Sequence, residues 1–181
     1  MATEKKLDCV ILGLLAHEDL TGYEIKKRMD TTLHYFWSAS YGSIYPTLKE
    51  LLSQDFVDVR EETKQGRKKQ IYHMTSLGSN YLKEWLSKPV LKDELRYETL
   101  LKLFFGKEVG KEQTLQHITA FQQHIQSELP YLYMAKKTLT SYISDDETHR
   151  YYLLTVEFGI QSYEAYLRWC KTACNVLKGV N

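Results

Sequence analysis

The sequence contains few of the residues that mark a secreted or membrane-spanning protein. Its 181 residues include only three cysteines and three prolines. The cysteines, Cys9, Cys170 and Cys174, are odd in number and lack the spacing of a disulfide framework, which is typical of reduced thiols inside a cell. No apolar run approaches the roughly 20 residues of a membrane span, and the run at residues 9–16 is too short for a secretory signal. We therefore expect a cytoplasmic protein without a membrane partner.

Motifs of catalysis and metal binding are also missing. The chain has no phosphate-binding glycine loop, no nucleophile elbow and no paired histidine motif. Residues 17–19 (His-Glu-Asp) could bind a metal, but they fall in a turn between helices, where short polar residues are ordinary. Cys170 and Cys174 are one helical turn apart, yet no nearby His or Cys completes a tetrahedral set, which favours a place in the core. The sequence predicts no catalytic residue, no metal and no cofactor, and hence no enzyme.

A charge of one sign is absent as well, since the formal net charge is only +1. Phosphate binding depends on local clusters of cations, because physiological salt limits the reach of a charge to about 8 Å. One such cluster is present, consisting of Lys64, Arg67, Lys68 and Lys69. A charge run of this kind is also ordinary in a solvated loop. The sequence on either side of the run therefore has to show whether it binds phosphate.

The segments around this cluster predict a helix followed by a hairpin. Residues 42–52 have the period of a helix, while residues 56–61 and 70–74 alternate as strands and place the cations at the tip between them. One side of the helix is apolar, with Ile44, Leu48, Leu51 and Leu52; the other has Ser43, Pro46, Lys49 and Glu50. Winged helices hold duplex DNA with these parts, because the helix enters the major groove and the wing contacts phosphates.

The candidate DNA-contacting residues lie at this helix, in the wing and in the preceding helix. They are Tyr23, Ser40, Gly42, Ser43, Tyr45, Thr47, Lys49, Arg67, Lys68 and Lys69. Glycine and serine at the helix start allow a phosphate to approach the backbone donors there. Tyr45 either packs as a half-buried side chain or offers its hydroxyl to the DNA backbone, and both alternatives stay open. No Arg, Asn or Gln lies on the exposed arc of the helix, so the bases that are read are not indicated.

Two helices are expected before this one and a fourth after the hairpin. Apolar residues at helical spacing predict the first at about residues 6–16. The second runs from Thr21 to about Asp30, because Thr21 and Glu24 have the spacing of a capping box, and a linker at residues 33–40 follows it. Thr75 is expected to cap the fourth helix. The apolar stripe of that helix is Leu77, Tyr81, Leu82, Trp85 and Leu86.

Residues 89–181 predict a helical domain with helices at about 92–105, 110–143 and 147–178. Pro130 is expected to kink or break the second of these. The last helix has two apolar stripes, and one small domain cannot cover both, so we expect a symmetric homodimer. One stripe has Leu153, Val156, Ile160, Tyr163, Leu167, Cys170, Cys174 and Leu177; the other has Tyr151, Phe158, Ala165, Trp169 and Val176. The candidate dimerisation residues are Leu153, Val156, Ile160, Tyr163, Leu167, Trp169, Cys170 and Cys174, and the sequence does not tell which stripe meets the partner.

Several short motifs follow one another in a recognisable order. They are Ile11-Leu12-Gly13-Leu14-Leu15, Thr21-Gly22-Tyr23-Glu24-Ile25, Gly42-Ser43-Ile44-Tyr45-Pro46-Thr47-Leu48, Gly66-Arg67-Lys68-Lys69-Gln70-Ile71-Tyr72 and Thr75-Ser76-Leu77-Gly78. Through them the chain resembles the PadR family of bacterial transcriptional regulators, and its second half is similar to the subgroup with phenolic-acid-responsive repressors. The resemblance implies a dimeric winged-helix regulator, usually a repressor, in some members released by a small molecule.

We therefore expect a mainly α protein with a small β-wing, made of a winged helix-turn-helix DNA-binding domain (residues 1–88) and a helical dimerisation domain (residues 89–181). The dimer should bind an inverted-repeat operator whose half-sites lie about 10 base pairs apart, or a multiple of this. Trp37, Phe104, Phe105 and Trp169 could line a pocket for a small aromatic inducer, or belong to the core. The alternative function is a winged-helix protein-interaction module that does not bind DNA.

Overall fold

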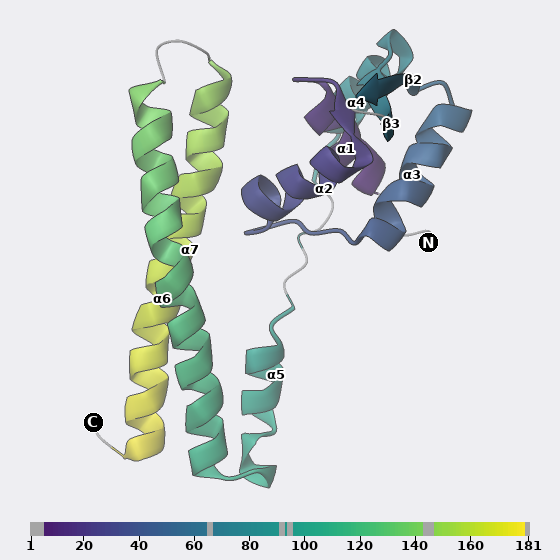
Figure 1. Ribbon diagram of the computed structural model, residues 1–181. Helices are drawn as coiled ribbons and strands as arrows, with labels where there is room; N and C mark the ends of the chain where they lie inside the picture. Colours follow the sequence, from purple (N-terminus) through teal and green to yellow (C-terminus); the bar gives the residue numbers. More distant parts are fainter. Residues whose placement is uncertain (1–5, 65–66, 91–92, 94–95, 143–146, 180–181) are drawn as a thin grey trace. The chain divides into compact units, whose positions relative to one another are not determined.

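The computed structural model describes residues 6–64, 67–90, 93, 96–142 and 147–179 (Figure 1). The chain forms two compact units, residues 1–93 and residues 94–181. Within the described ranges, no helix is both long and apolar enough to cross a membrane.

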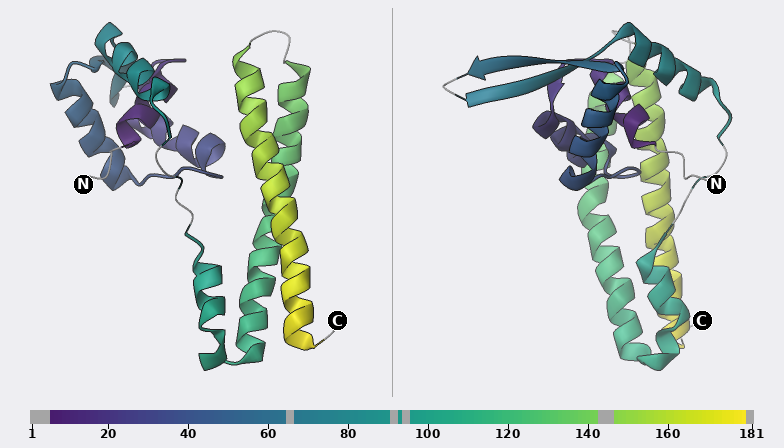
Figure 2. Two further views of the ribbon diagram at one scale, coloured as in Figure 1. Left: turned by 180° about the vertical axis from the view of Figure 1, so that it is seen from behind. Right: turned by 90° about the vertical axis from the view of Figure 1, so that its right-hand side faces the viewer.

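The described residues of the first unit form four α-helices and a small antiparallel sheet. In chain order it has α1 (Leu7–Leu15), β1 (Leu20–Thr21), α2 (Gly22–Arg28), the π-helical turn η1 (Met29–Leu33), α3 (Tyr41–Ser53), β2 (Val57–Lys64), β3 (Arg67–Met74) and α4 (Ser76–Ser87). The strand order is β1-β3-β2. β2 and β3 pair from Val57↔Met74 to Lys64↔Arg67, so both strands are longer than predicted. Residues 65–66, where the sequence predicted the hairpin tip with Gly66, lie outside the described residues. Figure 2 shows this hairpin extending beyond the helices of its unit.

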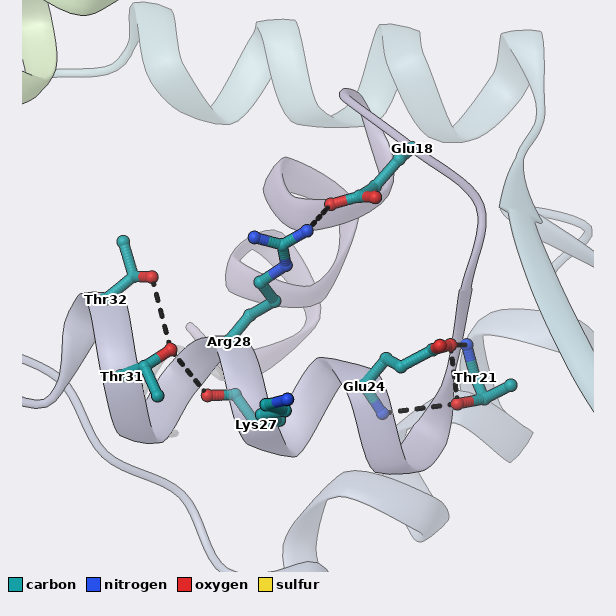
Figure 3. Close-up of polar contacts among 7 residues, drawn as sticks. All are labelled: Glu18, Thr21, Glu24, Lys27, Arg28, Thr31 and Thr32. Atoms are coloured by element: carbon teal, nitrogen blue, oxygen red, sulfur yellow. Dashed lines mark hydrogen bonds and ion pairs between the residues drawn. The ribbon is translucent and has the colours of Figure 1, made fainter.

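β1 was not predicted, because two residues are too few to show a period. It forms by pairing with β3, where Leu20 lies opposite Tyr72. The next helix also runs further than expected, because η1 continues α2 to Leu33. The hydroxyl of Thr31 donates a hydrogen bond of 2.9 Å to the carbonyl of Lys27 in this extension (Figure 3).

Local capping interactions set where α2 and α4 begin. The predicted capping box is confirmed: the backbone N–H of Glu24 donates to the Thr21 hydroxyl, while the Glu24 carboxylate accepts from the backbone N–H of Thr21 (Figure 3). Thr75 caps α4 as expected, accepting a hydrogen bond from the backbone N–H of Gly78. Gly78 has a second role, since a Cβ there would lie 2.1 Å from the carbonyl oxygen of Phe56. α4 can therefore pack against this backbone only with glycine at that position.

The core of the first unit collects the predicted apolar faces of its helices. Ile25 and Met29 are fully buried, as expected from their spacing. The core face of α3 is confirmed for its most buried members, Ile44, Leu48 and Leu51. The stripe predicted on α4 is too wide, because Leu77 and Leu86 are exposed and only Leu82 is buried. Only a narrow stripe of α4 packs against α1 and Phe56.

The second unit consists of α5 (Glu98–Phe104), the 3₁₀ turn η2 (Gly106–Glu108), α6 (Lys111–Ser141) and α7 (Thr148–Lys178). α6 and α7 lie side by side as a long antiparallel hairpin (Figures 1 and 2). α6 continues through Pro130, so of the two alternatives, a kink or a break, the break does not occur. Proline removes a single backbone donor, and packing along α7 keeps the rest of the helix in place.

One stripe of α7 packs against α6 of the same chain. Ile160 and Cys170 are buried there, and burial raises the pKa of the Cys170 thiol. The helices approach closely at Gly159, where a Cβ would lie 3.3 Å from Leu132. Half-buried on the same side are Leu153, Val156, Tyr163, Leu167 and Cys174. Ile160 is 4% exposed and Cys170 0%, so both lie against the same chain, and their assignment to a dimer contact stays a prediction.

Candidate functional site

The amino terminus of α3 presents backbone donors at the surface. Ser40 is the N-cap residue, but its hydroxyl does not cap the helix and instead lies 3.1 Å from the hydroxyl of Ser43. The N–H groups of Tyr41 and Gly42 belong to the first turn, where no carbonyl of the same helix can reach them. A Cβ at position 42 would meet only the Ser40 hydroxyl, at 3.6 Å. An anion such as a phosphate can therefore approach these donors, and the helix dipole favours it.

The outward side of α3 carries the polar residues that were predicted to meet DNA. Ser43 and Lys49 are exposed, whereas Thr47 is half-buried. The Thr47 hydroxyl donates a hydrogen bond of 2.9 Å to the carbonyl of Ser43, so it has only its lone pairs to offer a ligand. Tyr23, in the first turn of α2, is 62% exposed.

Tyr45 both packs and reaches the surface. A Cβ on Gly22 would lie 2.8 Å from its ring, so α2 and α3 approach each other through a contact between a glycine and an aromatic ring. The side chain is still 49% exposed. Tyr41, one turn earlier, stacks on Tyr45 with ring centroids 6.3 Å apart, and the Lys26 ammonium lies 5.7 Å from the Tyr41 ring centroid.

Sequence reasoning missed Tyr41 as a member of this surface and Lys26, whose ammonium is also paired with Asp30, as its neighbour. The spacing of Tyr41 and Tyr45, one helical turn apart, was the available signal. The place of Lys26 beside α3 depends on the packing of two helices and has no such signal in the sequence.

The hairpin places Lys68 and Lys69 on opposite faces, because successive residues of a strand alternate. Both side chains are exposed. The Lys68 ammonium lies 3.5 Å from the Glu61 carboxylate. The pKa of Glu24 lies below its usual range because its carboxylate accepts the backbone and hydroxyl hydrogen bonds of Thr21, with smaller contributions from the charges of Lys69 and Arg28. The side chains of Lys64 and Arg67 lie outside the described part of the structure.

Acidic residues are interleaved with the cations of this surface. Arg60 on β2 lies 3.2 Å from Asp19 and 3.6 Å from Glu62. Glu18, which was weighed as a metal ligand, forms an ion pair with Arg28 (Figure 3). Where the structure describes the chain, no group of three or more His, Cys, Asp or Glu side chains is placed to hold a metal.

The helix pair α2–α3, the small sheet and the projecting hairpin define the first unit as a winged helix-turn-helix domain. The chain belongs to the PadR-like family of transcriptional regulators. Residues 11–84 match the family described as "Transcriptional regulator PadR-like family", and residues 95–178 match "Virulence activator alpha C-term". The resemblance and the fold class inferred from the sequence are thereby confirmed.

The similarity to one relative extends over almost the whole chain. The negative transcriptional regulator PadR of Bacillus subtilis is 30% identical over 175 residues, which are 92% of this chain and 94% of that protein. A crystal structure of Bacillus subtilis PadR in complex with operator DNA superposes with a TM-score of 0.79 at 26% identity, covering 96% of this chain and 99% of that one. A structure of the same protein with p-coumaric acid gives a TM-score of 0.75 at 23% identity, with the same coverage.

Proposed function

We propose that this protein is a homodimeric, cytoplasmic transcriptional repressor that binds an inverted-repeat operator. The observation that carries the proposal is the arrangement of the first unit, in which free helix-start donors, the outward side of α3 and a projecting hairpin form one winged-helix surface. The similarity to Bacillus subtilis PadR, a negative regulator solved with operator DNA, supports it. We assign no catalytic role to any residue.

Each part of this surface has its own proposed contact. Ser40 and Gly42 bind a phosphate at the start of α3, while Ser43, Tyr45, Thr47 and Lys49 face the major groove. Arg67, Lys68 and Lys69 contact phosphates beside the groove, and Tyr23 contacts the backbone from α2. Phosphate contacts fix the position of the protein, and only the contacts of α3 in the groove depend on the base sequence.

The second copy is proposed to cover the outer face of α7, which we define as Tyr151, Leu154, Phe158 and Val176. Each of these side chains is more than 60% exposed in the single chain. They lie on the side of α7 opposite to Ile160 and Cys170, which pack on α6. A two-fold dimer buries the same face of both copies and brings two DNA-binding units to one operator.

A small aromatic ligand is proposed to release the repressor from its operator. The proposal is supported by the p-coumaric acid complex of the Bacillus subtilis relative. Among our four pocket candidates, Phe104 and Phe105 are exposed in the single chain, which leaves their rings open to a ligand or a partner. If p-coumaric acid is the inducer or resembles it, adding it should weaken operator binding without changing the unfolding temperature of the winged-helix domain.

The experiment that tests DNA binding is selection of duplexes from a random pool, followed by titration at several salt concentrations. A repressor enriches an inverted repeat, and the logarithm of its affinity falls with the logarithm of salt by about 0.9 per phosphate contact. Replacing Arg67, Lys68 and Lys69 together with alanine should lower that slope for operator and unrelated DNA alike. If no duplex is enriched and binding does not depend on salt, the protein is instead an interaction module.

A further inference from the structure

Two cations of the hairpin strands, Lys68 on β3 and Arg60 on β2, have carboxylate partners within the protein. The Lys68 ammonium is paired with Glu61 at 3.5 Å, and the Arg60 guanidinium with Glu62 at 3.6 Å and with Asp19 at 3.2 Å. The side chains of Glu61 and Glu62 are more than half exposed. The pair of Lys68 and Glu61 therefore lies where a DNA phosphate would have to bind.

Strand geometry distributes the carboxylates over both faces of the hairpin. Glu62 lies directly across from Lys69 on one face, where opposite charges attract. Glu61 lies across from Gln70 on the other face and reaches diagonally to Lys68. Neither lysine can meet a phosphate on its own face without a carboxylate beside it.

We propose that Glu61 and Glu62, the wing carboxylates, limit the affinity of the wing for DNA of any sequence. The inference rests on the proposed function, because it concerns how the wing binds phosphate. A phosphate that takes Lys68 has to displace Glu61, and the released carboxylate then repels the phosphate and takes up a cation from solution. That uptake offsets part of the counterion release that drives sequence-independent binding. The balanced charge of the chain then serves to keep binding to unrelated DNA weak.

The test compares Glu61→Gln with the wild-type full-length protein on a mixed-sequence duplex at several salt concentrations. Glu84→Gln is the matched control. Glu84 also forms an exposed ion pair, with Lys88 at 3.1 Å, and replacing it with glutamine changes the net charge by the same amount. Exposed ion pairs contribute little to stability, so both variants should unfold like the wild type. Glu61→Gln should bind the duplex about twofold to fivefold more tightly, the range set by exposed ion pairs, and its salt dependence should become steeper. Glu84→Gln should match the wild type in both respects.

Several results would overturn the inference and leave the proposed function intact. In the first, the wild type binds DNA in a salt-dependent way and Glu61→Gln binds it with the same affinity. In the second, Glu61→Gln and Glu84→Gln gain the same affinity for DNA, which would make net charge the cause. A third comes from Lys68→Gln: if Glu61→Gln strengthens binding as much in that background as alone, Glu61 does not act through Lys68. Absence of DNA binding by the wild type would instead remove the proposed function itself.

Discussion

The two units of this protein differ in how completely they bury their own apolar side chains. In the winged-helix domain, α1, α2, α3, α4 and the sheet all contribute fully or largely buried residues to one core. In the described part of the helical unit, the buried hydrophobic residues lie on α6 and α7, and large side chains such as Phe104, Leu154 and Phe158 are exposed in the single chain. Large exposed apolar side chains of this kind are typical of surfaces that bind a partner.

We therefore expect the two halves of the chain to obtain their stability in different ways. The winged-helix domain has the contacts of an independently folding unit, and its stability should not depend on protein concentration. The helical unit leaves the outer face of α7 open, so its stability should rise with concentration if a second copy covers that face. Substitutions in the two units can separate these behaviours.

The largest effect is expected from opposite faces of α7. Phe158→Glu puts a charge on the outer face and should give a folded monomer whose operator affinity falls about 100-fold or more, because the linked second half-site is lost. Ile160→Glu buries an unpaired charge against α6 and should unfold the helical unit. Sedimentation equilibrium measures the oligomeric state, circular dichroism the folding, and operator titration the DNA affinity. A dimeric Phe158→Glu with wild-type operator affinity would contradict the proposed interface.

The next effect concerns packing within the winged-helix domain. Gly78→Ala places a Cβ against the Phe56 carbonyl, where backbone cannot easily move, and should destabilise the domain by about 3 kcal/mol. Gly13→Ala is the matched control in α1, because a Cβ there meets nothing within 4 Å and alanine favours the helix by up to about 1 kcal/mol. Urea unfolding at two protein concentrations should give the same difference in unfolding free energy between Gly78→Ala and the wild type. A tolerated Gly78→Ala would mean that α4 is not held against Phe56.

A smaller effect is expected at the start of α2. Thr21→Ala removes the hydroxyl of the capping box and should cost about 1 kcal/mol. Because the pKa of Glu24 is lowered in the folded protein, its contribution is present at neutral pH and is lost as pH falls through that lowered pKa. Glu24→Gln should therefore be less stable than the wild type at neutral pH and approach it in acid. If the unfolding free energies of Glu24→Gln and the wild type change with pH in parallel, the Glu24 carboxylate does not stabilise the start of α2.

The smallest effect is expected from Tyr97 in the helical unit. Its hydroxyl is hydrogen-bonded to that of Tyr166, and burial together with this bond raises its pKa from 10.0 to about 12. A raised pKa means that the stabilisation is present below the ordinary pKa of tyrosine and is lost as pH rises toward about 12. Ultraviolet titration should show a late-titrating tyrosine that is missing in Tyr97→Phe. If the two titration curves coincide, the hydroxyl pair does not persist in solution.

Local features of this protein were determined by its sequence. The capping box of Thr21 and Glu24, the cap at Thr75 and the core positions Ile44, Leu48 and Leu51 could be predicted, because each depends on residues at most four apart in the chain. The order of the short motifs was also enough to identify the family from the sequence. The hairpin was predictable in kind but not in length, since its ends depend on pairing between strands.

Contacts between distant segments depend on how the elements pack and could not be predicted from local patterns. β1 exists because β3 pairs with it, Leu77 and Leu86 stay exposed because α4 covers a narrow strip, and Tyr45 rests on Gly22 because α2 and α3 cross there. The two stripes of α7 are equally apolar in sequence, and hydrophobic burial has no direction of its own. Only the packing of α6 selected the stripe with Ile160 and Cys170, and it thereby left the opposite face open.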